Sequence, residues 1–215
     1  MAKDRKKSYV VLGLGSFGTS TAIELEKQGI EVMAIDANKE RVEAVTPYVT
    51  CPIQLDVTNE SGLSNLGIKN MDGAIVSIGE NLEASVMATI LIKEMGVPMI
   101  YAKAENSLQK KILLKVGADR VIFPEKESGE RIATIIAGNF SDYFHLSDKV
   151  SIVEVTAKKE WVGKNLVELD FRNRYQVNVI ALKRNGEVLF VDGKTAIEAN
   201  DDIIAAGENH YLENL

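Results

Sequence analysis

The chain has one cysteine, two histidines, four prolines and one tryptophan among its 215 residues. With Cys51 as the single thiol, an internal disulfide and a metal site built on several cysteines are both excluded. No apolar run approaches the ~18 residues of a membrane-spanning helix. The apolar stretch after Lys7 soon meets glycines, so it cannot form the core of a signal peptide. We therefore expect a soluble, intracellular chain that does not itself span a membrane.

Positive charge is also scarce, because the formal net charge is −6. Nucleic-acid binding needs a basic surface, so no nucleic-acid partner is expected. The short start of mixed sign, residues 3–7 (KDRKK), is expected to be a solvated tail. Three motifs of hydrolytic and phosphate-transfer enzymes are missing too, since no P-loop, HExxH or nucleophile elbow occurs.

What the chain does contain is the stretch from Tyr9 to Gly18, which reads YVVLGLGSFG. Its apolar half predicts a buried strand, and its glycines form the pattern GxGxxG before a helical periodicity begins. Gly13 permits a tight turn, Gly15 lets the backbone approach a pyrophosphate, and Gly18 lets helix and strand pack closely. The free N–H groups at the start of that helix favour bound phosphate.

A second apolar run, residues 31–35, ends at Asp36. This carboxylate lies ~20 residues beyond the glycines, where it can accept hydrogen bonds from both ribose hydroxyls. An acid at this place disfavours a 2′-phosphate and hence NADP. The order strand, glycines, helix, strand and acid therefore predicts an adenine-nucleotide site.

Strand and helix patterns alternate six times up to about residue 137. This alternation predicts an α/β fold, in which residues 1–138 form a doubly wound, parallel-sheet Rossmann domain. Ligands of such sheets bind beyond the carboxyl ends of the strands. The sequence places polar residues at four of these ends: Asp36, Asp56, Ser77 and Lys103.

The remainder of the chain has a different pattern. Residues 139–149 are expected to be a crossover linker whose aromatic residues pack against another surface, such as a neighbouring subunit. Residues 150–215 show alternating strands, a short helical stretch at 166–174 and a hairpin signal at Asn185-Gly186. They predict a small, β-rich α+β domain of roughly 65 residues, whose modest core favours dimerisation.

Two classes of function fit a nucleotide site on such a sheet. A dehydrogenase needs an acid or base beside its substrate. His145 and His210 fall in the linker and near the C-terminus, and Lys103 has no Tyr or Ser at a recognisable spacing. We therefore favour a sensor, which is not an enzyme, and an NAD-dependent oxidoreductase with unknown substrate is the alternative.

Longer motifs cover nearly the whole chain. They read VLGLGSFG, MAIDAN, DVTNESGLSNLGI, AIVSIGENLEASVMATILIKEMGV, KAEN, KILLKVGADRVIFPEKESGERIA, SIVEV and VIALKRNGEV. In these motifs the chain resembles the cytosolic regulatory subunits of bacterial Ktr/Trk potassium uptake systems, of the TrkA and KtrA type. These subunits are built from RCK (regulator of K+ conductance) domains.

The resemblance implies homodimers that assemble into an octameric cytoplasmic ring beneath an integral-membrane K+ channel or transporter. Binding of ATP, ADP or NAD(H) would shift the conformation of the ring and so gate K+ flux. The chain would then be cytoplasmic and attached to the inner face of the cell membrane through its partner. Regulation of some other transporter by the same domains is a further alternative.

The resemblance also implies roles for single residues. Gly13, Gly15 and Gly18 match the phosphate loop, Asp36 the ribose acid, Asp56 a contact near the adenosine, and Lys103 a phosphate contact. The implied cofactor-binding set also contains Ser16, Phe17, Val57, Ser77, Ile78 and Gly79. Glu125, in FPEK, matches a carboxylate that helps to hold Mg2+ or Ca2+ between paired domains. Its alternative role is a favourable charge in the first turn of a helix.

Two further points concern ligands. The C-terminal domain resembles one that binds cyclic di-AMP at a dimer interface, and Arg172, Asn178 and Ile180 lie in the corresponding stretch. Ktr members usually carry arginine within GLGRFG, where this chain has Ser16. Loss of that charge-assisted phosphate contact removes one way to favour ATP over ADP. The identity of the nucleotide is therefore left open, NAD(H) included.

Overall fold

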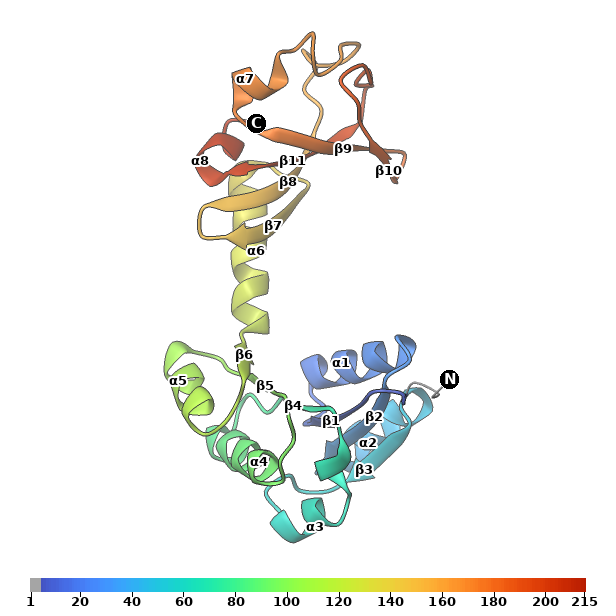
Figure 1. The fold of residues 1–215 in the computed structure, drawn as a ribbon, viewed down its shortest axis with the longest axis vertical. Helices are drawn as coiled ribbons and strands as arrows, with labels where there is room; N and C mark the ends of the chain where they lie inside the picture. Colours follow the sequence, from blue (N-terminus) through green and yellow to red (C-terminus); the bar gives the residue numbers. More distant parts are fainter. Residues whose placement is uncertain (1–4) are drawn as a thin grey trace. The chain divides into compact units, whose positions relative to one another are not determined.

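The computed structural model describes residues 5–215, so Lys3 and Asp4 of the expected tail lie outside the described residues. The chain divides into two compact units, residues 1–126 and 127–215 (Figure 1). Helix α6 (Pro124–Gly138) begins in the first unit and continues in the second. The domain limits expected from the sequence at 138 and 150 stay predictions. No helix within residues 5–215 is both long enough and apolar enough to cross a bilayer.

The first unit is built on a sheet of six parallel strands. They are β1 (Ser8–Leu12), β2 (Glu31–Asp36), β3 (Cys51–Gln54), β4 (Gly73–Val76), β5 (Ile100–Lys103) and β6 (Arg120–Ile122). Their order is β3-β2-β1-β4-β5-β6, which reverses direction between β1 and β4. Such a reversal opens a crevice at the carboxyl ends of the two strands. The expected doubly wound parallel sheet is confirmed.

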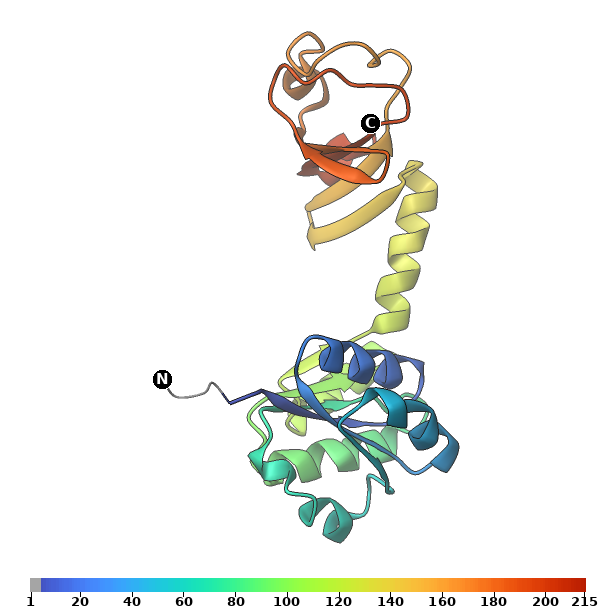
Figure 2. The same ribbon diagram turned by 90° about the vertical axis from the view of Figure 1, so that its right-hand side faces the viewer.

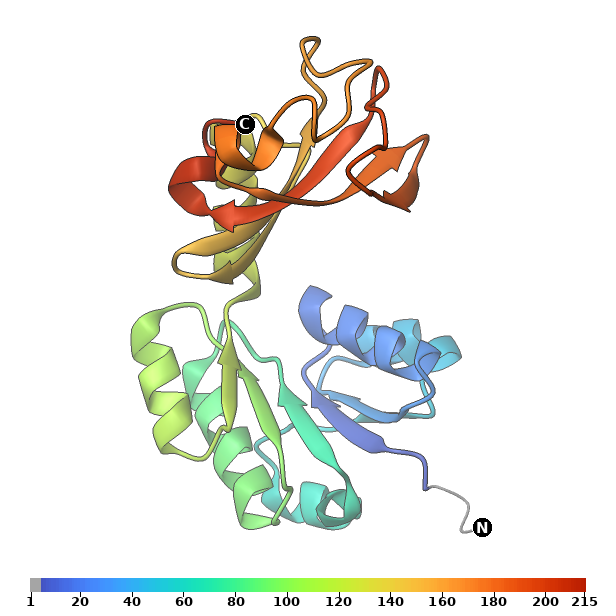
Figure 3. The ribbon, with the colours of Figure 1, turned by 45° about the horizontal axis from the view of Figure 1, so that its top comes forward.

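Helices cover both faces of this sheet (Figure 3). They are α1 (Ser16–Lys27), α2 (Lys39–Val45), α3 (Glu60–Ser64), α4 (Leu82–Glu94) and α5 (Ser107–Lys115). Successive side chains of a strand point to opposite faces. Val11 of β1 therefore packs with Ala22 of α1 and Val42 of α2. Leu12 lies in the core of the other face, together with residues of α3, α4 and α5.

The second unit contains an antiparallel sheet of five strands. They are β7 (Asp142–Ser147), β8 (Val150–Thr156), β9 (Asn178–Arg184), β10 (Glu187–Phe190) and β11 (Asp202–Glu208), in the order β10-β9-β11-β8-β7. Helices α7 (Phe171–Tyr175) and α8 (Asn209–Leu212) accompany it. The expected hairpin joins β9 to β10, and Asn185 and Gly186 have the positive φ values, 53° and 84°, that a two-residue turn requires. The expected β-rich α+β domain is confirmed.

The structure differs from the expected crossover linker at residues 139–149. Asp142–Ser147 forms β7, which pairs with β8 as a hairpin (Figure 2). Phe140 is buried in the core of the second unit, and the Tyr143 hydroxyl lies 2.7 Å from the Ser151 hydroxyl. Phe140 and Tyr143 thus pack on their own domain, whereas Phe144 is 49% exposed.

A buried ion pair joins β9 to the loop before β11. The Asp201 side chain is 1% exposed and accepts hydrogen bonds from Nε and Nη2 of Arg184, both at 2.8 Å. The Glu198 N–H donates to the same carboxylate at 2.8 Å. These bonds, that of Arg184 above all, hold the pKa of Asp201 below its ordinary value. The pair therefore stabilises the second unit wherever Asp201 is ionised.

Replacement of Asp201 by asparagine is expected to lower the free energy of unfolding of the second unit by about 1–3 kcal/mol, because the Arg184 donors lose a charged acceptor. Urea unfolding followed by the fluorescence of Trp161, the single tryptophan, measures this change. The matched control is Glu187→Gln, an exposed acid on β10 that takes no part in the pair of Arg184 with Asp201. This control should change stability by less than about 0.5 kcal/mol.

The same pair predicts a pH dependence. The pKa of Asp201 is lower in the folded state than in the unfolded state. The stabilisation that this shift supplies to the folded state is therefore complete above the unfolded pKa of about 3.9, and it is lost as the pH falls through the folded pKa. The stability difference between wild type and Asp201→Asn should stay constant from about pH 7 to pH 5 and shrink only in stronger acid. A difference that already shrinks near neutral pH would contradict this assignment.

Candidate functional site

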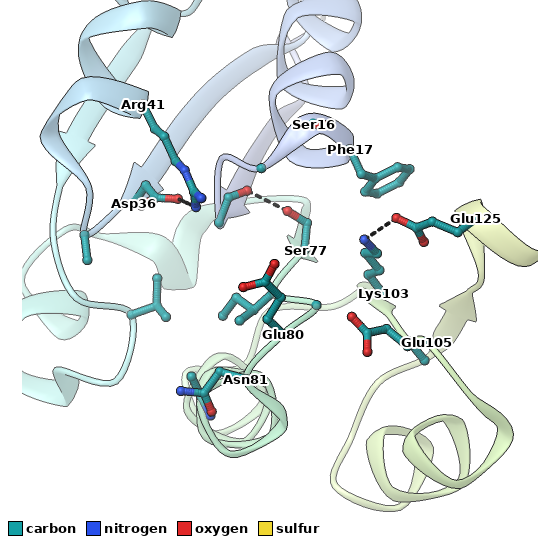
Figure 4. A pocket seen from close by; sticks show the side chains of 18 of the residues that line it. Ser16, Phe17, Asp36, Arg41, Ser77, Glu80, Asn81, Lys103, Glu105 and Glu125 are labelled. Carbon is teal, nitrogen blue, oxygen red and sulfur yellow. Dashed lines mark hydrogen bonds and ion pairs between the residues drawn. The ribbon is translucent and has the colours of Figure 1, made fainter.

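A cavity of about 800 Å³ lies in the first unit, beyond the carboxyl ends of β1, β2, β4 and β5 (Figure 4). Its size suits a nucleotide. Eleven residues expected at the nucleotide site line it: Gly13, Gly15, Ser16, Phe17, Asp36, Asp56, Val57, Ser77, Ile78, Gly79 and Lys103. The structure thus brings together residues that are separated by up to 90 positions in the sequence.

The three glycines of the loop after β1 have different surroundings. Gly13 has φ +95°, which favours glycine, and an added Cβ would lie 3.1 Å from the Ser77 carbonyl oxygen. A Cβ at Gly15 would meet nothing within 4 Å, so the backbone here is open to the cavity. A Cβ at Gly18 would lie 2.0 Å from the Gly13 carbonyl oxygen. Gly18 does not line the cavity and serves the close packing of α1 against the loop.

The start of α1 differs from the starts of the neighbouring helices. In α2, α3, α4 and α5 an asparagine side chain accepts hydrogen bonds from the first turn; the four residues are Asn38, Asn59, Asn81 and Asn106. The N-cap of α1 is Gly15, which offers no side-chain acceptor, and the first turn contains no acidic residue. The first N–H groups of α1 therefore remain donors at the edge of the cavity, which is the arrangement that binds phosphate.

Asp36 stands at the end of β2 with its carboxylate fixed by backbone donors. The Leu14 N–H donates to Oδ2 at 2.6 Å, and the Asn38 N–H donates to Oδ1 at 2.7 Å. The side chain is only 9% exposed, and Nη1 of Arg41 lies 3.5 Å from Oδ2. Each oxygen accepts one N–H and keeps a further lone pair, so the carboxylate can still accept hydrogen bonds from a ligand.

Lys103 and Glu125 form an ion pair at another part of the cavity, with 2.5 Å between Nζ and Oε1. Lys103 is 13% exposed, whereas Glu125 is 66% exposed. The hydrogen bond from Lys103 is the main reason why the pKa of Glu125 is lowered. A Cβ built on Gly79 would lie 3.0 Å from Oε1 of Glu105 and 3.3 Å from Lys103 Nζ. The Lys103 ammonium group therefore lies among carboxylates (Figure 4).

Sequence reasoning missed several residues that line the cavity. They are Ala37, Arg41, Glu80, Asn81, Ala84, Ala104, Glu105 and Lys126. Three of them, Ala37, Ala104 and Glu105, lie within two residues of an expected polar strand end, so extending those ends by two residues would have found them. Arg41 lies five positions after Asp36, and its place in the first turn of the expected helix is the signal that was available.

Three expected site residues belong to the second unit. Arg172 and Asn178 line a cavity of about 360 Å³ there, and Ile180 does not line it. Ile180 lies two positions after Asn178 on β9, on the same face of the strand, and is 40% exposed. His145 on β7 and His210 on α8 are also in the second unit, outside the nucleotide-sized cavity.

Metal binding at Glu125 stays a prediction. In the described part of the chain, no group of three His, Cys, Asp or Glu side chains is placed to hold a metal ion. The Glu125 carboxylate is instead satisfied by Lys103. One chain therefore does not supply a complete ligand set at this position.

Comparison with known proteins agrees with this architecture. Residues 9–124 match the TrkA-N domain and residues 150–215 match the TrkA-C domain. Two curated relatives come from Bacillus subtilis (strain 168). Ktr system potassium uptake protein C is 40% identical over 93% of this chain and 90% of its own length. Ktr system potassium uptake protein A is 40% identical over 87% of this chain and 85% of its own.

The chain belongs to the family of Ktr system potassium uptake proteins. The resemblance expected from the motifs is thereby confirmed. Among solved structures, the RCK domain of GsuK superposes with a TM-score of 0.69 at 17% identity, over 99% of this chain. The chain spans 47% of the length of that GsuK chain, and the similarity shows a shared fold.

Substitution of Gly15 and of Gly18 by alanine is expected to have different effects on stability. Gly18→Ala should lower the free energy of unfolding of the first unit by about 1–3 kcal/mol, because its Cβ overlaps the Gly13 carbonyl and the Ser77 hydroxyl. Gly15→Ala should change it by less than about 0.5 kcal/mol, since Gly15 has φ −69° and open space around it. Thermal unfolding followed by circular dichroism measures both variants. Equal losses in the two would refute the different roles.

Proposed function

We propose that this chain is a nucleotide-sensing regulatory subunit of a bacterial potassium uptake system. The observation that carries the proposal is that one cavity contains both the uncapped start of α1 at Gly15 and the fixed carboxylate of Asp36. The first suits the phosphates of a nucleotide and the second suits its ribose hydroxyls. The relatives named as potassium uptake proteins supply the physiological context.

In this proposal each side of the cavity binds one part of an adenine nucleotide. The backbone from Gly13 to Phe17 binds the phosphates, and Asp36 binds the ribose. Asp56, Val57 and Ile78 border the adenosine. Ser77 also lines the cavity, and its hydroxyl donates a hydrogen bond to the Gly13 carbonyl oxygen at 2.5 Å, which holds the loop. The alternatives ATP, ADP and NAD(H) share these adenosine and phosphate groups, so the three ligands compete for one site.

Lys103 connects the phosphates with α6. A phosphate group that approaches the Lys103 ammonium competes with Glu125 for its hydrogen bonds. Glu125 lies in the first turn of α6, the helix along which the chain continues into the second unit. Release of Glu125 by phosphate therefore alters the start of that helix. Nucleotides with different phosphate groups would release it to different extents, which is the differential binding that a population shift requires.

The partner in this proposal is an integral-membrane K+ channel or transporter subunit, because the relatives are named for potassium uptake. The chain would act in the cytoplasm at the inner face of the membrane, as homodimers assembled into an octameric ring. A change from mostly closed to mostly open needs about 5.5 kcal/mol of differential affinity, which several sites in a ring could share.

Two further ligands extend the proposal. Cyclic di-AMP would bind the second unit near Arg172, Asn178 and Ile180 of two paired chains. Mg2+ or Ca2+ at Glu125 would need additional ligands from the nucleotide and from a second chain, because residues 5–215 of one chain offer no complete set. Neither ligand is needed for the adenine-nucleotide site itself.

Nucleotide binding is tested by thermal unfolding of the purified protein with ATP, ADP, NAD or NADH, each with and without Mg2+. A ligand at about 100 times its Kd should stabilise by about 2.7 kcal/mol and raise the Tm of the first unit by about 5 °C or more. Asp36→Ala should abolish the shift, because the ribose loses its acceptor. The exposed Glu40→Ala, which does not line the cavity, should retain it. No shift of the wild type with any of the four nucleotides would overturn the proposal.

The competition at Lys103 makes a second prediction. Glu125→Gln removes the charge that holds Lys103, so ADP should bind about three- to tenfold more tightly, as expected for loss of a partly exposed competing ion pair. Isothermal titration measures the Kd. Glu83→Gln, an exposed acid on α4 that does not line the cavity, is the control and should leave the Kd unchanged. Weaker binding of ADP to Glu125→Gln would mean that Glu125 contributes to the ligand site directly.

A further inference from the structure

Acidic side chains outnumber basic ones along the wall of the nucleotide-sized cavity. Among the residues that the structure describes, three basic side chains line it: Arg41, Lys103 and Lys126. Five acidic side chains line it as well: Asp36, Asp56, Glu80, Glu105 and Glu125. The formal charge of the lining is therefore −2, although the ligands proposed above carry negative phosphate groups. A wall of this sign works against each further negative charge on a bound ligand.

Two of the acids, Glu80 and Glu105, have no cation of their own. Lys103 is already paired with Glu125, and neither Glu80 nor Glu105 takes part in an ion pair between described residues. A Cβ built on Gly79 would lie 3.0 Å from Oε1 of Glu105, so this carboxylate stands over the backbone that follows β4. The negative charges of Glu80 and Glu105 are therefore not neutralised by an ion pair.

The strand order decides which part of a ligand meets these two charges. Asp36 ends β2, whereas Glu80 lies after β4 and Glu105 after β5, on the other side of β1. Figure 4 shows Lys103 and Glu105 on the side of the cavity away from Asp36, with Glu80 between the two sides. This inference rests on the function proposed above, in which the ribose lies at Asp36 and the first phosphate at the start of α1. The remainder of the ligand then extends toward β4 and β5, and the group beyond its second phosphate meets Glu80 and Glu105.

The proposed ligands differ in the charge of that group. ATP places a third phosphate there, whereas ADP ends before it. NAD places there a nicotinamide ring that carries a positive charge, whereas the ring of NADH is neutral. Carboxylates repel a third phosphate and attract a cationic ring, so the same two side chains act on both pairs of ligands.

We infer that Glu80 and Glu105 are specificity-determining residues, which select a nucleotide by the charge of the group beyond its second phosphate. The favoured ligands are a nucleoside diphosphate and a dinucleotide with a cationic ring. The disfavoured ligands are the nucleoside triphosphate and the reduced dinucleotide. The sensor accordingly responds to the oxidation state of NAD as well as to the number of phosphates.

Isothermal titration without Mg2+ at about 0.05 M NaCl, where charges are weakly screened, tests this selection. Wild type should bind ADP about two- to tenfold more tightly than ATP, and NAD more tightly than NADH by a factor in the same range, as expected for exposed charges. The double variant Glu80→Gln/Glu105→Gln should lose both preferences. The control Glu83→Gln/Glu94→Gln removes two exposed acids of α4 that do not line the cavity, and it should keep both preferences.

Salt supplies a readout that a purely steric role of the two glutamates would not move. At about 0.5 M NaCl both preferences of the wild type should fall toward equal binding, because the Debye length is then less than about 5 Å. Preferences that stay unchanged at this salt concentration would overturn the electrostatic selection.

The remaining outcomes separate this inference from the proposed function. If wild type binds neither ADP nor NAD, the proposed function is overturned, and this inference with it. If wild type binds both but shows no preference over ATP or none over NADH, the inference alone is overturned. Preferences that persist in Glu80→Gln/Glu105→Gln come from other groups, which also overturns it. Should this double variant fail to unfold cooperatively, the single variant Glu105→Gln decides the matter through a partial loss of both preferences.

Discussion

The hydrogen bond from the Leu14 N–H to Asp36 is the interaction on which the rest of the nucleotide-sized cavity depends. At 2.6 Å it ties the loop after β1 to the end of β2. The loop can take this path only because Gly13 has a positive φ and Gly18 has no side chain to separate α1 from it. The start of α1 and the carboxylate are thereby held in one place, before any ligand arrives.

A second constraint concerns the opposite part of the cavity. Lys103 at the end of β5 is paired with Glu125 at the start of α6, so the charge that would meet phosphate is also the charge that holds the first turn of this helix. If a ligand phosphate and Glu125 compete for the Lys103 ammonium group, ligand binding also changes the contacts of α6, the helix that contains Glu125. In the proposed function such a competition would supply the different affinities through which ligands shift an equilibrium between states.

Much of this arrangement could be predicted from the sequence because local rules determine it. Apolar runs, Asn caps and glycines gave the order of elements in the first unit, and Asn185-Gly186 gave the hairpin of the second. Two ion pairs could not be predicted, those of Lys103 with Glu125 and of Arg41 with Asp36. They depend on which strand ends become neighbours and on side-chain rotamers, and the hydrophobic periodicity of the sequence does not report either. Residues 142–147 were expected to be part of a linker that packs against another surface. They form β7 because Phe140 and Tyr143 are packed on the core of the second unit.

The central claim is that one cavity holds the ribose at Asp36 and the phosphates at the start of α1. Bound phosphate also breaks the ion pair of Lys103 with Glu125. A crystal structure of the protein with bound ADP tests it most directly. The account predicts ribose hydroxyls within hydrogen-bond distance of Asp36, phosphate oxygens at the N–H groups that follow Gly15, and a broken contact between Lys103 and Glu125. ADP bound elsewhere, or bound at the glycine loop with the Lys103–Glu125 pair intact, would contradict the account.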